Sequence, residues 1–317
     1  MSKIKISLII ILIFNSYKIL HATDNTSSHS NQDPYDYDSI STFTVIPCVH
    51  DFSPIPTIDN ALATHPIYMC HKKAIIIGAS SDITRNLISL LTADGYLIGV
   101  IDGEERTLQQ IQYDTPSMLF TKKITHSNVT QITSLFNELV YEMNGLDLMI
   151  ITNNIWPELK AHTQNGLLLP NNTINLEYER NTITVNITNF VTIANAALNY
   201  FIKKGSGHLV GITSLDVFSG NAACPTYSAS KAFSSIYLQG MRKRLNQLNI
   251  PITITEIRRE WSTIKNYITN QYWTIPADQA AKTIRNAIAH KQNTAYITQQ
   301  WWPIAVLRKL IPNWFSF

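Results

Sequence analysis

The amino-acid sequence predicts an α/β protein whose single domain is built around a doubly wound parallel sheet of about seven strands. Apolar runs and helical stretches alternate along residues 72–300, as they do where each strand is followed by a helix. The apolar runs are continuous instead of alternating with polar residues, which is typical of strands covered on both faces. The chain is also long enough, at 317 residues, to bury a sizeable core around such a sheet.

The first strand is the run KAIIIGA at residues 73–79, which ends in a glycine and an alanine. The next stretch places Ile83, Leu87 and Leu90 at helical spacing and predicts a helix over residues 81–94. The later strands are expected at residues 96–101, 118–124, 146–152, 207–213, 252–257 and 294–298. The later helices are expected at residues 129–143, 174–204, 225–248 and 277–291.

The segments outside this domain differ from it in composition. Residues 1–22 combine a basic start with the apolar run SLIIILIF, which predicts a signal peptide or an N-terminal anchor. Residues 23–71 are polar and irregular, and we expect a linker or a loosely packed arm. Residues 301–317 form an aromatic C-terminal tail that suits a membrane surface, a partner, a pocket cover or the chain's own sheet edge. We therefore expect an exported or membrane-associated protein, with a cytoplasmic location as the alternative.

Charge and cysteine content exclude several classes of protein. The formal net charge is +3 and no dense run of Lys and Arg occurs, so nucleic acid is not an expected partner. Three cysteines are too few for a disulfide scaffold. The four residues Cys48, His50, Cys70 and His71 match no common zinc spacing, and we expect no metal site.

The segment YSASK, residues 227–231, carries the strongest catalytic signal. Tyr227 and Lys231 lie four residues apart, so on a helix they share one face. A tyrosine, with a pKa of about 10, is a poor base at neutral pH, but a nearby ammonium favours the phenolate and lowers that pKa. The pair therefore suits proton transfer. Taken alone, it also fits a surface tyrosine beside a solvated lysine.

Other residues place this pair in a wider pattern. Ser214 follows the strand predicted at residues 207–213 and stands 13 residues before Tyr227, and Asn186 lies in the preceding helical stretch. Together with the run Gly78-Ala79-Ser80-Ser81 and the pattern of alternating strands and helices, these residues resemble the short-chain dehydrogenases/reductases. The resemblance covers about residues 72–300 and implies a Rossmann-like fold.

The resemblance implies an NAD(P)-dependent oxidoreductase that interconverts a carbonyl and an alcohol by hydride transfer. Tyr227 would transfer the proton at the substrate oxygen, and Lys231 would lower the tyrosine pKa and hold the nicotinamide ribose. Ser214 would hydrogen-bond the substrate oxygen, and Asn186 would anchor a water in the proton relay. The implied cofactor-binding residues are Gly78, Ser80, Ser81, Ile83, Asp102, Asn153, Tyr227 and Lys231.

The cofactor site also departs from the family pattern. Only Gly78 remains of the glycines in T-G-x-x-x-G-x-G, and Asp82 stands where a phosphate would bind, so Asp82 either competes with the ligand or caps the helix and points away. Asn154 takes the place of a turn glycine, and Arg259-Glu260 takes the place of a Pro-Gly pair. Asp102, at the end of the second strand, can bind both ribose hydroxyls and repel a 2′-phosphate, so we expect NAD, with NADP less favoured.

Two functions stay open on these residues. The set of Asn186, Ser214, Tyr227 and Lys231 favours an active oxidoreductase on a small-molecule carbonyl or alcohol, which the apolar chain ends could attach to a membrane. The missing glycines and the export signal favour a non-catalytic Rossmann-like binding protein with lost or weak dinucleotide affinity. Contact with a membrane surface through the N-terminus or the C-terminal tail, and a homo-oligomer, stay open as well.

Overall fold

The structure is a computed structural model that describes residues 71–115, 119–124, 129–152, 163–164, 167–168, 176–218, 220, 224–259 and 275–297. The chain divides into two compact units, Met1–Thr57 and Ile58–Phe317, and every described residue belongs to the second. The predicted signal peptide or anchor, almost all of the predicted linker and the whole aromatic tail lie outside the described residues. Within the described residues, no helix has both the length and the apolar content needed to cross a membrane.

A seven-stranded sheet forms the centre of the fold. All its neighbouring strands run parallel, in the order β3-β2-β1-β4-β7-β8-β9. The strands are β1 (Lys72–Ile77), β2 (Tyr96–Asp102), β3 (Leu119–Lys123), β4 (Leu148–Ile151), β7 (Gly207–Ser214), β8 (Ile252–Arg259) and β9 (Thr294–Tyr296). The prediction of a doubly wound parallel sheet with seven strands is confirmed. Two short strands outside it, β5 (Thr163–Gln164) and β6 (Leu167–Leu168), form a separate antiparallel pair.

The order of the strands reverses next to β1. The chain first adds β2 and β3 on one side of β1, and then returns to add β4 and the later strands on the other side. In open α/β sheets the crevice at such a reversal, beyond the carboxyl ends of the strands, is where ligands bind. The topology therefore directs attention to the residues that follow β1, β4 and β7.

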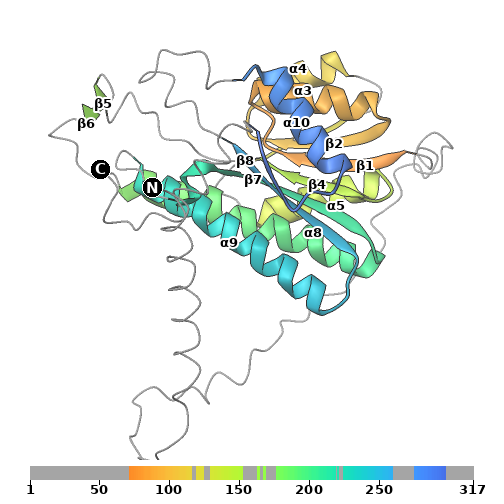
Figure 1. Cartoon of the computed structure of the whole chain (residues 1–317). Coiled ribbons are helices and arrows are strands. Elements are labelled where there is room, and N and C mark those ends of the chain that lie inside the picture. The colour runs from red at the N-terminus through yellow and green to blue at the C-terminus, as the bar shows by residue number, and fades with distance from the viewer. Residues whose placement is uncertain are drawn as a thin grey trace, which may run out of the picture. The chain divides into compact units, whose positions relative to one another are not determined.

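Helices cover both faces of the sheet (Figure 1). One face carries α3 (Asp82–Ala93), α4 (Glu105–Asp114) and α10 (Ala277–Ala289), and the other carries α5 (Val129–Glu142), α8 (Phe190–Lys204) and α9 (Pro225–Gln247). The run of isoleucines in β1 serves both layers, because Ile76 packs under the first set of helices and Ile75 and Ile77 under the second. Burial on both faces explains why the strands read as continuous apolar runs.

Two of the differences from the sequence-based expectation concern longer helical segments. Helix α4 was not predicted, because its mostly polar segment has only Thr107, Leu108 and Ile111 buried. The helical stretch expected at residues 174–204 is interrupted: α7 (Leu176–Ile183) and α8 are joined by η2 (Thr184–Asn189), a π-helix. A π-turn is one residue wider than an α-turn, and apolar periodicity over six residues does not separate the two.

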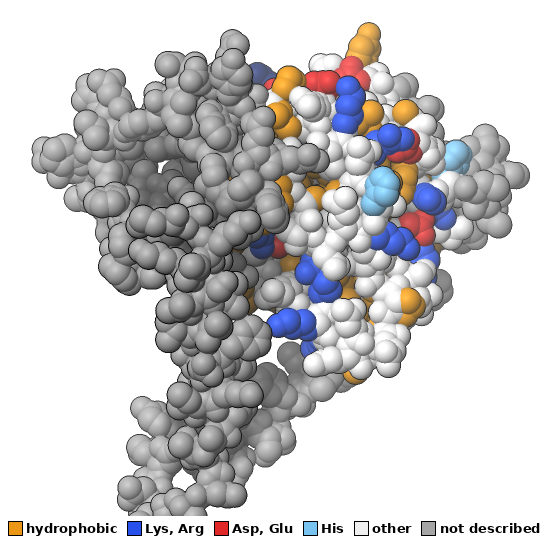
Figure 2. All heavy atoms as spheres, viewed as in Figure 1, with side chains coloured by type: hydrophobic (Ala, Val, Ile, Leu, Met, Phe, Trp, Pro, Cys, Tyr) orange, Lys and Arg blue, Asp and Glu red, His pale blue; other side chains and the backbone are white. Residues whose placement is uncertain are grey.

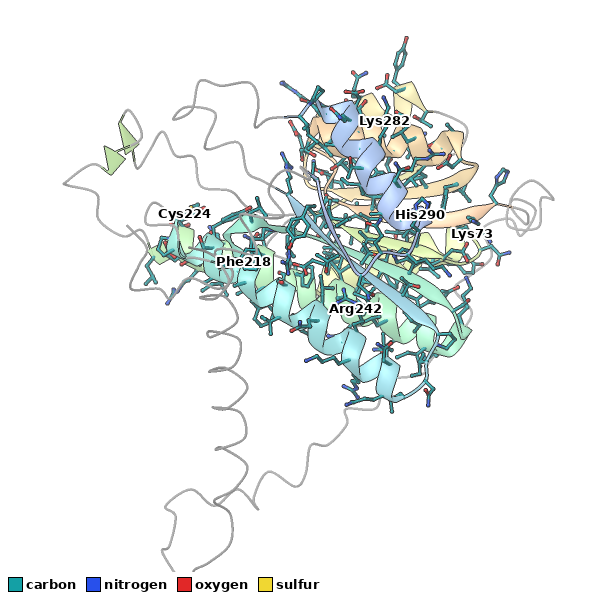
Figure 3. All side chains as sticks on the ribbon, in the orientation of Figure 1. Lys73, Phe218, Cys224, Arg242, Lys282 and His290 are labelled. Atoms are coloured by element: carbon teal, nitrogen blue, oxygen red, sulfur yellow. The ribbon has the colours of Figure 1, made fainter. Side chains whose placement is uncertain are left out.

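Helix α9 lies close to the sheet because β7 has a glycine beneath it. A Cβ atom at Gly211 would come within 2.6 Å of the Leu238 side chain of α9. Arg242, labelled in Figure 3, also joins α9 to the sheet by donating hydrogen bonds to Ile254 O (3.1 Å) and Asn293 O (2.7 Å). These contacts fix the helix that carries Tyr227 and Lys231.

On the surface shown in Figure 2, acidic and basic side chains are interspersed.

Candidate active site

Tyr227 and Lys231 lie in the first two turns of α9, and both side chains are buried. Pro225 occupies the start of the helix, where its missing N–H and fixed φ are tolerated. The Lys231 ammonium lies over the ring of Tyr227, 5.6 Å from its centroid. The two residues therefore share a buried face of the helix, which excludes the alternative of a surface tyrosine beside a solvated lysine.

The electrostatic surroundings of Lys231 shift its protonation equilibrium. Burial, with the Arg259 charge as a second cause, lowers the pKa of Lys231 from 10.5 to about 7. A lysine with that pKa exchanges its proton readily at neutral pH. Perturbation of this kind, in a group next to a tyrosine at the sheet edge, is typical of catalytic sites.

Asn186 connects the π-helix to α9. Its side chain is buried within η2, and its Nδ2 donates to Ser230 Oγ at 3.1 Å. The Ser230 hydroxyl in turn donates to the backbone oxygen of Tyr227 at 2.7 Å. A π-turn inserted in a helix is frequently found at a functional site, and here it aims the Asn186 amide at the turn that bears the tyrosine.

Ser214 is the last residue of β7 and is buried at the carboxyl edge of the sheet. The segment after it, η3 (Leu215–Phe218), packs against α9, and Figure 3 shows Phe218 and Cys224 near the beginning of that helix. The Arg258 guanidinium stacks on the Phe218 ring, 4.7 Å from its centroid, and pairs with the buried Glu256 carboxylate at 2.9 Å. This pair steadies the chain that leaves Ser214.

Arg259 is a site residue whose position the sequence did not reveal. It is the last residue of β8, is registered opposite Ser214 and lines a cavity of about 20 Å³ together with Tyr227. Burial lowers the pKa of Arg259, and the nearby Tyr227 opposes that shift. In the sequence, Arg259 stands out only as one half of the Arg-Glu pair that replaces Pro-Gly, and that pattern does not tell where the side chain points.

The turn between β1 and α3 holds three of the residues expected to bind a cofactor, Gly78, Ser80 and Ser81. Gly78 has φ of +89°, a conformation that glycine adopts without strain, and its N–H donates to Ile101 O at 2.9 Å. Ser81 is the N-cap of α3 and accepts a hydrogen bond from Thr84 N at 3.2 Å. Ile83, in the first turn of α3, reaches the same cavity as Tyr227 and Arg259. The cavity thus lies between the first turn of α3 and the first turn of α9.

Asp102 ends β2 and holds this turn in place. Its Oδ2 accepts from Ala79 N at 2.5 Å and from Ser80 Oγ at 3.1 Å, and its Oδ1 accepts from Glu104 N at 2.8 Å. The side chain is 3% exposed. A carboxylate has about four acceptor positions, and donors among the described residues occupy three of them. The sequence pattern suggested a ribose ligand and did not reveal this bracing of the β1–α3 turn.

The structure bears on the expectation for Asp82 but not on the expectation for Asn153. The Asp82 side chain is 74% exposed and forms an ion pair with Arg85 one turn further along α3. This geometry agrees with the second alternative, in which Asp82 points away from the phosphate position, although Ser81 is the capping residue. Asn153 and Asn154 lie outside the described residues, whereas the preceding Thr152 lines the cavity.

The structure also bears on the expectation that the chain has no metal site. Among the described residues, no cluster of three or more His, Cys, Asp or Glu side chains could hold a metal ion. Of the four residues weighed as zinc ligands, only His71 is described, and its Nδ1 lies 2.9 Å from Gly95 O. The question of a site that includes Cys48, His50 and Cys70 lies outside the described residues.

A comparison with protein families matches residues 72–258 to the family described as short chain dehydrogenase. The chain belongs to the short-chain dehydrogenases. The match begins at β1 and ends at β8, so it includes Asn186, Ser214, Tyr227 and Lys231. The resemblance inferred from these residues is confirmed, and the chain is an oxidoreductase.

Known relatives of this short-chain dehydrogenase carry the same general name. An oxidoreductase of Myxococcus xanthus, itself described as uncharacterized, is 28% identical over 188 residues, which cover 58% of this chain and 70% of the relative. One from Staphylococcus epidermidis, named in the same way, is 24% identical over 184 residues and covers 57% of this chain and 75% of the relative. These names support an oxidoreductase that acts on a small molecule, and they name no substrate.

Solved structures of similar fold are short-chain dehydrogenases as well. One from Streptomyces avermitilis aligns with a TM-score of 0.61 and 14% identity over 76% of this chain and 92% of its own. Another from Mycobacterium smegmatis aligns with a TM-score of 0.59 and 14% identity over 73% of this chain and 92% of its own. At these identities the likeness bears on the fold alone, which is the Rossmann-like sheet described above.

The described residues of this short-chain dehydrogenase fit a nicotinamide dinucleotide. Gly78 leaves β1 in the left-handed conformation that a tight phosphate-binding turn requires, and the N-terminus of α3 follows at once. Asp102 lies against that turn, and described donors occupy three of its about four acceptor positions. Ile83 and Thr84, at the start of α3, line the same cavity as Tyr227.

Proposed function

We propose that this oxidoreductase reduces a carbonyl group, or oxidises the corresponding alcohol, with proton transfer through Tyr227. A bound nicotinamide supplies or accepts the hydride. The observation that carries the proposal is the buried contact between Lys231 and Tyr227 at the carboxyl edge of a parallel sheet. Because that edge is where ligands of such sheets bind, the tyrosine hydroxyl would meet a substrate oxygen there.

Each of the four residues has a role that its surroundings support. In the direction of reduction, Tyr227 donates its phenolic proton to the carbonyl oxygen as the carbon takes the hydride. The Lys231 ammonium stabilises the phenolate that remains. Ser214, at the end of β7, holds the oxygen in place by a hydrogen bond, and Asn186 keeps the tyrosine turn in register through Ser230.

Within this proposal NAD(H) is the cofactor and NADP(H) is less favoured. Asp102 presents a buried carboxylate beside the turn that would hold the adenosine ribose. A carboxylate there accepts hydrogen bonds from ribose hydroxyls and repels a 2′-phosphate. The acceptor position that the turn leaves on this carboxylate would take a ribose hydroxyl.

The direct test is binding of the reduced cofactor, followed by turnover of a carbonyl panel. Titration with NADH and NADPH, read by the fluorescence of the reduced nicotinamide, is expected to give saturable binding with tighter affinity for NADH. Tyr227→Phe should then bind NADH as the natural protein does and fail to reduce any carbonyl that the natural protein reduces. Tyr141→Phe is the matched control, because Tyr141 is 69% exposed on α5. Absence of NADH and NADPH binding would reject the proposal.

Contact with a membrane surface and assembly into a homo-oligomer stay predictions. The N-terminal segment and the aromatic tail, on which the membrane prediction depends, lie outside the described residues. Gel filtration coupled to light scattering would give the mass of the particle, and flotation with lipid vesicles would test the membrane contact.

A further inference from the structure

Arg258, on β8, is the centre of a polar cluster where the sheet meets α9. Its Nε and one terminal nitrogen donate to the two carboxylate oxygens of Glu256, at 2.9 Å and 3.0 Å. This is the bidentate pairing that suits a planar guanidinium. The same cation donates to Tyr296 Oη on β9 at 3.0 Å and to Ser235 Oγ on α9 at 3.3 Å. One side chain therefore joins β8 and β9 to α9.

The cluster also contacts the chain on both sides of Ser214. One residue before Ser214, Thr213 donates its hydroxyl to Glu256 Oε1 at 2.8 Å. Four residues after it, the ring of Phe218, labelled in Figure 3, lies against the Arg258 guanidinium, with 4.7 Å from the ring centroid to Cζ. Both contacts end on the same ion pair, so they limit how far the backbone of Ser214 can shift between them.

The same cluster reaches the helix that carries Tyr227 and Lys231. Ser235, which accepts from Arg258, follows Lys231 by four residues, so the two side chains lie one turn apart on one face of α9. Both are buried, as is Tyr227 two turns before Ser235. The ion pair of Arg258 thus connects the end of β7 to the face of α9 that bears the tyrosine and the lysine.

Burial makes this connection stiff. The side chain of Glu256 is 4% exposed and that of Arg258 is 15% exposed. An unpaired charge in such surroundings is far more costly than a paired one, so the carboxylate and the guanidinium hold each other in place. The guanidinium also donates to Tyr296 and Ser235 at the same time, which leaves it little freedom to swing away.

We propose that Arg258 is a positioning residue that sets the distance between the Ser214 and Tyr227 hydroxyls through its contacts with β7, η3 and α9. The proposal rests on the proposed function, because it takes these two hydroxyls as the groups that meet the substrate oxygen. A misplacement of about 1 Å in such a site can lower the rate about 100-fold. Loosening the cluster should therefore lower kcat. It should leave NADH affinity unchanged, because the described contacts of Arg258 do not include the β1–α3 turn.

Two substitutions loosen the cluster without leaving Glu256 unpaired. Arg258→Lys keeps the charge and loses the planar fork, whereas Phe218→Leu keeps the ion pair and loses the ring. The assay follows oxidation of NADH or NADPH by the full chain, with 2,3-butanedione and 4-nitrobenzaldehyde as carbonyl probes. We expect kcat to fall about 100-fold in Arg258→Lys and about tenfold in Phe218→Leu, with the Kd of NADH within about twofold of the natural value.

The matched control is Arg285→Lys. Arg285 forms a similar fork with Asp94 between α10 and the end of α3, at the other edge of the sheet. The control loses that fork and should keep the natural kcat. Unchanged kcat in Arg258→Lys overturns the proposal. So does a loss of kcat that only follows the unfolded fraction, measured by circular dichroism at the assay temperature.

A double-mutant cycle tests whether Phe218 acts through Ser214. Phe218→Leu should lower kcat about tenfold in the natural protein and leave it nearly unchanged in the Ser214→Ala background, because that background has no hydroxyl to misplace. Equal losses in the two backgrounds would show that the ring has a general structural role, and would overturn the proposal.

Amide hydrogen exchange separates this proposal from the proposed function, because it needs no turnover. In the full chain, Arg258→Lys should speed exchange at residues 213–218 about tenfold and leave exchange in β1 unchanged. Equal exchange at residues 213–218 in Arg258→Lys and the natural protein overturns the proposal. If neither cofactor binds and neither probe is reduced, the proposed function fails, and faster exchange at residues 213–218 still supports the anchoring of Ser214 by Arg258.

Discussion

Replacing Lys231 by methionine should stabilise the protein while removing its activity. Lys231 is 3% exposed, and the pKa of its ammonium falls from 10.5 to about 7 on folding, mainly through burial. Methionine fills a similar volume and carries no charge, so it occupies the site without the desolvation penalty. The same substitution removes the cation that favours the Tyr227 phenolate, and turnover should be lost.

The size of the effect follows from linkage between protonation and folding. A shift from 10.5 to about 7 is worth about 4 kcal/mol of lost stability at pH 7, at about 1.4 kcal/mol for each pKa unit. Loss of the contact between the ammonium and the Tyr227 ring offsets about 1–2 kcal/mol of this gain. The variant is therefore expected to be more stable by about 2–3 kcal/mol at pH 7, or by about 4–12 °C in Tm.

The dependence on pH gives the sharper test. The unfolded lysine binds a proton up to about pH 10.5 and the folded lysine only up to about pH 7, so the natural protein gains stability as pH rises between these values. The penalty should fall from about 4 kcal/mol at pH 7 to about 2 kcal/mol at pH 9, and the advantage of Lys231→Met should shrink equally. Urea denaturation of both proteins at each pH measures the difference directly.

A control on the same helix guards against a general effect of removing charge. Lys243 is exposed on α9, and Lys243→Met should change the free energy of unfolding by less than about 0.5 kcal/mol at either pH. The reasoning is refuted if Lys231→Met is no more stable than the natural protein at pH 7, or if its advantage is the same at pH 9.

Three further perturbations test other parts of the structure. Tyr227→Phe should abolish turnover and leave the dissociation constant of NADH within about threefold, because the ring stays and only the transferable proton is lost; substantial residual turnover contradicts its role. Asp102→Asn should narrow the preference for NADH over NADPH, measured by fluorescence titration. It should also lower the free energy of unfolding, because Ala79 N–H and Ser80 lose a charged acceptor. Equal affinities of the natural protein for NADH and NADPH would rule out the NAD assignment. Burial lowers the pKa of His208 to about 4, so protonation of this residue should cost the folded protein about 3 kcal/mol of stability as pH falls from 6.5 to 4. His208→Gln should remove this loss of stability. If the stability of the variant depends on pH as that of the natural protein does, another group is responsible.

The fold could be predicted from the sequence because the patterns that identify its strands and most of its helices are local. Continuous apolar runs such as the isoleucines of β1 identify strands buried on both faces, and they do so without knowledge of their neighbours. The helix of residues 105–114 escaped prediction for the complementary reason. It buries only Thr107, Leu108 and Ile111, and so small an apolar stripe becomes a helix only because the sheet is there to cover it.

The candidate site likewise contains one contact that local spacing predicts and one that depends on the fold. Tyr227 and Lys231 could be paired in advance, because four residues on a helix make one turn whatever surrounds them. The contact of Asn186 with Ser230, across 44 residues, depends on a π-turn that widens the helix at that point. The separation of Asn186 and Ser230 in the sequence does not predict this contact.

By itself the sequence determined the strands, most of the helices, the pairing of Tyr227 with Lys231 on one helix and the family to which the pattern belongs. Only the tertiary structure decided that Asp102 braces the β1–α3 turn and that Arg259 reaches the cavity of Tyr227. The physical reason is that periodicity and spacing encode which face of an element is buried, whereas a contact across the sheet edge depends on strand order, register and twist. Those are settled by packing of the whole domain, so residues far apart in the chain meet there without a local signature.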